Sequence, residues 1–227
     1  MTVAANWPLK AALALFIIII SVTAFGQDIK PDNALHLARS SSPDTSQGPI
    51  RNIKPEHQKL AKGRFLIANI RVQGQIFGQS VILLISHDQN GSMGLIINRQ
   101  TDSGIADLLP DVKGLAQSSD ALYLGGPVSL NSFFLLVRSG VKPEESENII
   151  ADIYISQSKA LLQRMADEKR PGEKFRLYAG YAGWGAGQLE AEVIRGDWIV
   201  APADPEIIFD KDPAGIWNRL MPQKIDI

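Results

Sequence analysis

The side chains best suited to nucleophilic chemistry stand together near the middle of the chain. His87 and Asp88 are neighbours, with Ser86 before them and Ser92 shortly after. A histidine backed by a carboxylate can activate a serine hydroxyl, which is how many hydrolases work. Adjacent residues of a strand point to opposite faces of a sheet, which disfavours such a group here. The pattern therefore favours a turn-stabilising or surface role for His87 over catalysis.

A second stretch, Tyr178 to Glu192 (YAGYAGWGAGQLEAE), is rich in glycine and aromatic residues. Glycine-rich loops can cradle phosphate groups because their backbone amides are unobstructed. This stretch lacks a GxxxxGKS or GxxxxGKT pattern and holds the bulky Trp184, so nucleotide binding is not expected. Glu190 and Glu192 are two apart on a predicted helix and face different ways, which disfavours paired acid–base catalysis. Positive φ angles and close backbone packing better explain the glycines.

The same clustering predicts a groove that captures a protein partner, a peptide or a small molecule. Its expected members are Tyr181, Trp184, Gln188, Glu190 and the turn from Pro202 to Pro205, which contains Asp204. We therefore expect a non-enzymatic binding or regulatory module with no catalytic residues. A hydrolase of unrecognised type, using His87 or one of Asp204, Glu190 and Glu192, is the alternative. Core and turn requirements alone would explain the same composition.

Composition narrows the range of cofactors and partners. The 227-residue chain has no cysteine, which excludes disulfides, thiolate catalysis and cysteine-ligated zinc or iron–sulfur clusters. His87 is the one histidine of the predicted domain, and the carboxylates show neither EF-hand nor HExxH spacing, so no metal or cofactor is expected. The net charge is -1, with Lys and Arg interspersed among Asp and Glu, which argues against direct nucleic-acid binding.

Strand and helix patterns along the chain are typical of one mixed α/β domain. Apolar strands are expected at 64–70 and 79–88, and Asn90-Gly91 then suits a tight hairpin that returns along 92–99. The unbroken apolar centre of 79–88 predicts a central strand. Further strands are expected at 121–124, 133–137, 149–155, 175–181 and 198–201. Helices are expected at 103–109, 158–168, 188–195, 205–209 and 214–220.

Residues 1–26 differ in kind from the rest. Ala11 to Phe25 is an uncharged apolar run after Lys10, which matches a signal-peptide core better than a full membrane span. Cleavage before Gln27 would export the protein, whereas an uncleaved run would anchor it on the periplasmic side of a membrane. A misassigned start upstream of a cytoplasmic protein is the alternative. Residues 27–61 are expected to form a polar flexible linker and residues 62–227 the domain.

Four segments of the predicted domain resemble the YqgE/AlgH family of small bacterial proteins. They are His87 to Arg99 (HDQNGSMGLIINR), Leu122 to Val128 (LYLGGPV), Tyr178 to Glu192, and Trp198 to Phe209 (WIVAPADPEIIF), in the family's order. The resemblance implies an α+β fold: a curved, largely antiparallel mixed sheet with flanking helices. It also brings the label of a transcriptional regulator acting in the cytoplasm, although the sequence shows no helix-turn-helix motif and no basic patch.

The sequence departs from the family pattern at two places, one in a loop and one at the N-terminus. Gln100 stands where family members typically have proline after the Asn-Arg pair, which affects the detail of one loop. Family members generally begin near Lys62 without a hydrophobic leader, so the apolar N-terminal run sets the expected location of this chain apart from theirs. Contact with a membrane is expected only through that run.

Overall fold

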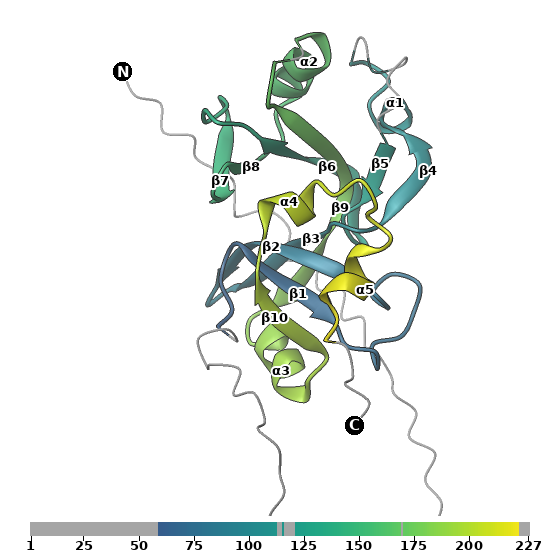
Figure 1. Ribbon diagram of the computed structural model, residues 1–227, viewed down its shortest axis with the longest axis vertical. Helices are drawn as coiled ribbons and strands as arrows, with labels where there is room; N and C mark the ends of the chain where they lie inside the picture. Colours follow the sequence, from purple (N-terminus) through teal and green to yellow (C-terminus); the bar gives the residue numbers. More distant parts are fainter. Residues whose placement is uncertain (1–58, 113–114, 116–120, 169, 223–227) are drawn as a thin grey trace, which may run out of the picture. The chain divides into compact units, whose positions relative to one another are not determined.

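Ten strands and five short helices make up the part of the chain that the computed structural model describes, residues 59–112, 115, 121–168 and 170–222 (Figure 1). The strands are β1 (Arg64–Ala68), β2 (Val81–Asp88), β3 (Gly91–Ile96), β4 (Gln100–Gly104), β5 (Ala121–Leu124), β6 (Val128–Arg138), β7 (Ser146–Ile150), β8 (Ile153–Ser156), β9 (Lys174–Gly185) and β10 (Trp198–Pro202). The helices are α1 (Ile105–Leu108), α2 (Lys159–Asp167), α3 (Gln188–Arg195), α4 (Pro205–Ile208) and α5 (Ile216–Leu220).

The strands pair into one curled sheet. Its order is β10-β1-β2-β3-β9-β6-β8-β7, and β5 joins it by pairing with both β4 and β9 (Figure 1). The pairings are antiparallel except that of β5 with β9, where Leu122 lies opposite Leu177 in parallel register. The predicted single α+β domain with a curved, largely antiparallel mixed sheet and flanking helices is confirmed.

The hairpin of β2 and β3 forms as its sequence predicts. Residues 81–85 are buried, and β2 lies between β1 and β3 as a central strand. The backbone N–H of Asn90 donates to Oδ1 of Asp88 at 2.7 Å, which closes the turn. Gly91 follows with a φ of +141°, and a Cβ atom there would lie 2.3 Å from the carbonyl oxygen of Trp184. Asp88 is therefore a turn-forming residue.

The long strand β9 joins the two parts of the sheet. Residues 177–179 pair with β5 on one side and β6 on the other, and residues 182–185 pair with β3. Gly180, between these stretches, has a φ of +65°. The backbone that links β5 to β6 passes directly against β9 at this point. A Cβ atom on Gly126 would lie 2.2 Å from the carbonyl carbon of Tyr181. The glycines of the two segments thus permit direct backbone contact.

Apolar side chains form three clusters, each covered by helices. Ile208 of α4 and Ile216 of α5 pack into the first cluster, which contains the fully buried Tyr178. Helix α2 covers the second cluster with Leu162. Helix α3 covers the third with Leu189. Burial raises the pKa of the Tyr178 phenol above its ordinary value, so this side chain is neutral at physiological pH.

Beyond shifts in where elements begin and end, the observed elements differ from the predicted ones in type, number or pairing partner at three places. Residues 100–104 form β4, so the helix predicted at 103–109 begins only at Ile105. The single strand predicted at 149–155 is two strands, β7 and β8, with Ala151 at a φ of +46° in the turn between them. The strand predicted at 175–181 continues to Gly185, because the hairpin strand β3 supplies a partner for residues 182–185. The glycine-rich run is therefore largely strand.

The predicted N-terminal segments lie almost wholly outside the described residues. This holds for the signal peptide or anchor at 1–26 and for all but the last residues of the linker at 27–61. Within the ranges that the structure does describe, no helix is both long enough and apolar enough to cross a bilayer.

Candidate functional site

Helix α3 builds a polar site on the sheet, directly after the glycine-rich end of β9. Gly187 precedes the helix with a φ of +73°, and Gly196 ends it with a φ of +80°. Leu189 is fully buried and fixes the helix on the apolar cluster that contains Trp184 and Trp198. Polar residues of α3 contact neighbours from β2, β9 and β10.

Glu192 is the centre of a hydrogen-bonded group that we call the indole clamp, formed with Trp184, Trp198 and Gln188. Its Oε2 accepts from Nε1 of Trp184 at 2.9 Å and from Nε1 of Trp198 at 2.8 Å. Its Oε1 accepts from Nε2 of Gln188 at 3.0 Å, and Oε1 of Gln188 accepts from the backbone N–H of Gly185 at 3.1 Å. The two indole rings meet edge to face with centroids 6.1 Å apart. Hydrogen bonds to a charged acceptor are among the stronger ones in proteins, so the clamp ties α3 to the sheet.

A second polar group, which we call the imidazole corner, consists of His87, Ser92 and Glu190. Strand register places His87 opposite Ser92 across the hairpin, and Nδ1 of His87 lies 2.8 Å from Oγ of Ser92. Nε2 of His87 lies 3.8 Å from Oε1 of Glu190 on α3. Asp88 instead accepts from the hairpin turn, so the carboxylate that faces the imidazole is Glu190.

Only part of the predicted groove is assembled in one place. Trp184 and Gln188 both hydrogen-bond to Glu192, whereas Glu190, on the same helix as Gln188, contacts His87 instead. Tyr181 packs against Phe134 in a different apolar cluster, with ring centroids 5.9 Å apart. Asp204 accepts from the backbone N–H of Glu206 at 2.9 Å and caps α4. Tyr181 and Trp184 are three apart on one strand, so their side chains point to opposite faces.

Trp198 belongs to the site although the sequence did not single it out. Its indole shares an acceptor with Trp184, and Glu192 supplies that acceptor from the next turn of α3 after Gln188. The signal that was available is the spacing of Gln188 and Glu192, four apart and hence on the same helix face. The pairing of the two indoles depends on the docking of α3 and was not available from the sequence.

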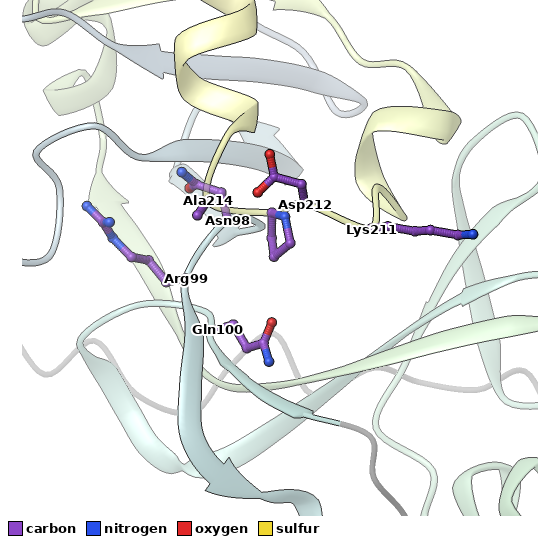
Figure 2. A pocket seen from close by; sticks show the side chains of 7 residues that line it. Asn98, Arg99, Gln100, Lys211, Asp212 and Ala214 are labelled. Carbon is purple, nitrogen blue, oxygen red and sulfur yellow. The ribbon is translucent and has the colours of Figure 1, made fainter.

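A pocket of about 410 Å³ lies elsewhere, between the β3–β4 link and the loop from α4 to α5 (Figure 2). Both amide atoms of Asn98 are used: Oδ1 accepts from Val81 N at 2.9 Å, and Nδ2 donates to Gln79 O at 2.9 Å. Arg99 donates to Gly78 O, and burial lowers the pKa of its guanidinium. Figure 2 shows the charged ends of Arg99 and Lys211 turned away from the space between them. The pocket therefore has few free polar groups directed into it.

Known proteins with similar sequences match the folded part of this chain. The AlgH-like family model matches residues 65–225. A UPF0301 protein of Methylococcus capsulatus is 35% identical over 170 residues, which cover 74% of this chain and 93% of the relative. A UPF0301 protein of Chlamydia abortus is 35% identical over 162 residues, which cover 71% of this chain and 85% of the relative.

Two solved structures resemble the domain. The solution structure of the AlgH protein from Pseudomonas aeruginosa aligns with a TM-score of 0.57 at 34% identity, covering 71% of this chain and 85% of that one. A crystal structure of a Corynebacterium diphtheriae protein aligns with a TM-score of 0.58 at 28% identity, covering 72% and 86%. The resemblance drawn from the four sequence segments is confirmed, and the chain belongs to the AlgH-like, UPF0301 family.

Proposed function

We propose that the chain is a non-enzymatic binding module that recognises a cationic group of a peptide or protein partner at the imidazole corner. The observation that carries this proposal is the state of Glu190. Its side chain is 44% exposed, and its carboxylate has only the 3.8 Å contact with His87 among the described residues. A carboxylate with free acceptor positions binds an ammonium or guanidinium group through charge-assisted hydrogen bonds.

The indole clamp supports this role by holding α3 rigidly. Glu192 and Gln188 are hydrogen-bonded to each other and to Trp184, Trp198 and the backbone of Gly185. Their contribution is to fix the helix that carries Glu190, so the binding group needs little reorganisation. Preorganisation of this kind strengthens binding because less conformational freedom is lost.

Titration of the full chain with two matched peptides tests the proposal. An acetylated tri-lysine peptide should bind and shift the NMR signals of His87 and Glu190, whereas an acetylated tri-glutamate peptide should not. Glu190→Gln should weaken tri-lysine binding by roughly tenfold, the size of one charge-assisted hydrogen bond. Glu144→Gln, which changes an exposed carboxylate far along the chain, is the matched control. Equal binding by wild type and Glu190→Gln would contradict the proposal.

A serine hydrolase is the second candidate, favoured by the 2.8 Å contact between Nδ1 of His87 and Oγ of Ser92. Two features weigh against it. The 3.8 Å distance from Nε2 of His87 to Glu190 is beyond hydrogen-bond reach, and Ser92 is only 8% exposed. A fluorophosphonate reagent separates the candidates, because labelling of Ser92 that is lost in His87→Ala would support a hydrolase. A binding module predicts no more labelling than in Ser92→Ala.

A further inference from the structure

A second and larger pocket, of about 550 Å³, opens where the chain enters β1. Its walls come from the residues that lead into β1, from the end of β7 and from the end of β10, and they are Lys59, Ala61, Lys62, Gly63, Arg64, Ile150 and Pro202. We call it the basic pocket, because three of its seven lining residues are cations and none is acidic. Its volume lies within the range of small-molecule sites, roughly 300–1,000 Å³.

Arg64 gives the basic pocket its distinctive charge. The other arginines of the described residues each donate to a carboxylate or a backbone carbonyl, and they are Arg71, Arg99, Arg138, Arg164, Arg170, Arg176, Arg195 and Arg219. Within the described residues, the side chain of Arg64 forms neither a hydrogen bond nor an ion pair. A partly buried arginine with no counter-ion among the described residues is suited to bind an anion.

The two lysines add charge that is only partly compensated. Nζ of Lys62 lies 2.7 Å from Oε1 of Glu147, an exposed residue of β7. Lys59 is exposed and has no ion pair within the described residues. Counting Lys62 as paired, Lys59 and Arg64 leave an excess of two positive charges at the pocket. That excess matches the charge of a phosphate monoester, about −1.5 to −2 at neutral pH.

Two hydrogen bonds hold the backbone between Lys62 and Arg64. Gly63 donates from its N–H to Leu84 O at 2.9 Å, and its carbonyl accepts from Ala203 N at 3.2 Å. A Cβ atom there would lie 3.2 Å from Ile149 O, and φ is +77°. The segment between Lys62 and Arg64 is thus clamped from both sides, so the charged side chains start from a rigid base.

We propose that the basic pocket binds a phosphate monoester, with the Arg64 guanidinium contacting two phosphate oxygens and Lys59 and Lys62 completing the charge. Arginine is suited to this because its planar fork matches the spacing of phosphate oxygens. Ile150 and Pro202 supply an apolar wall for the organic group that the phosphate carries. The proposal stands apart from the imidazole corner, which is acidic and on other elements.

Calorimetric titration of the full chain with glycerol 3-phosphate at low ionic strength tests binding of a free phosphate monoester. Sedimentation with phosphatidylcholine vesicles, prepared with or without phosphatidic acid, tests binding of the same chemical group at a membrane surface. Binding in either arm supports the proposal and identifies the source of the phosphate. Arg64→Gln should weaken binding by about tenfold, and Arg64→Lys by less, because a lysine keeps the charge and loses the fork. Binding should also weaken as salt is added.

Lys211→Gln, at the pocket of Figure 2, is the matched control and should bind as wild type does. Circular dichroism of each variant shows whether it is folded. Should Arg64→Gln fail to fold, Lys59→Gln carries the test, because Lys59 lies outside the strands, and it should weaken binding several-fold. Absence of binding in both arms, or equal binding by wild type and the folded pocket variants, would overturn the proposal.

Discussion

The indole clamp under α3 and the basic pocket beside β1 both concentrate polar side chains, yet they differ in how their charges are satisfied. In the clamp, the Glu192 carboxylate has three donors within 3.0 Å. In the basic pocket, the Arg64 side chain has no acceptor within the described residues. A filled hydrogen-bond network stabilises the fold, whereas an unfilled one is free to bind. Clustering of polar and aromatic residues in the sequence does not distinguish the two cases.

Glu192→Ala is expected to lower the free energy of unfolding more than any other substitution considered. The substitution removes the acceptor of both indole N–H groups, and each buried donor left unsatisfied costs roughly 1–3 kcal/mol. The free energy of unfolding should therefore fall by about 3 kcal/mol, measured by urea denaturation followed by circular dichroism. Glu192→Gln keeps an acceptor oxygen and should lose less. A loss below about 1 kcal/mol for the alanine variant would contradict a structural role for the clamp.

Trp198→Phe should have the next largest effect. It removes one donor to Glu192 while keeping an aromatic ring near Trp184 and Phe77. A loss of about 1–2 kcal/mol is expected from the missing hydrogen bond and the smaller ring. The same change made in the Glu192→Ala background should cost less, because its acceptor is already gone. Strictly additive losses would show that the indole and the carboxylate act independently.

Arg164 of α2 forms an ion pair with Glu173, and the contribution of this pair to the free energy of unfolding should depend on pH. It serves as a comparison in which the charge has a partner. Arg164 donates to Glu173 at 3.0 Å and, as the main cause, lowers the pKa of that carboxyl. The folded pKa is below the unfolded one, about 4.3. The contribution is therefore present above about pH 4.3 and is lost as the pH falls through the folded pKa.

Glu173→Gln should cost about 1 kcal/mol or less at pH 7, with the difference from wild type shrinking toward pH 3. Urea unfolding of both proteins at the two pH values measures it. A difference that stays constant with pH would mean that the charge of Glu173 contributes nothing.

The smallest effect on stability is expected in the basic pocket. Arg64→Gln breaks no hydrogen bond or ion pair of the described residues, so the free energy of unfolding should change by less than about 0.5 kcal/mol. Thermal and urea unfolding measure the change. A large loss would place Arg64 with the structural residues of the clamp and would erase the contrast between the two regions.

Local sequence signals predicted the elements that carry them. Asn90-Gly91 predicted the hairpin, Ser158 caps α2 through Leu161 N at 3.2 Å, and Asp204 with Pro205 begins α4. Strand β4, with the sequence QTDSG, has no alternating apolar pattern and exists because β5 pairs with it. Propensity and turn chemistry are local, so elements that depend on a distant partner were missed.

The site was predicted less well than the fold for a related reason. The sequence placed Trp184, Gln188 and Glu190 together because they are near one another in the chain. It paired His87 with Asp88, whereas the structure brings in Glu190, because register across two strands and the docking of α3 decide which carboxylate faces the ring. The missing partner of Arg64 could not be foreseen at all, since it depends on every neighbour in space.

The pairing of β1 with β10 has a consequence for synthesis of the chain on the ribosome. Arg64 lies opposite Pro202, and Ala68 lies opposite Trp198. One edge of β1 therefore stays unpaired until β10, the last strand, has been synthesised. During translation, at roughly 5–20 residues per second, a nascent chain that ends before β10 leaves the apolar β1 with an unpaired edge. Such an edge is a template for misassociation between chains, and pairing so distant in sequence is slow to form. Synthesis of β10 is thus the step that removes this exposed edge from the growing chain.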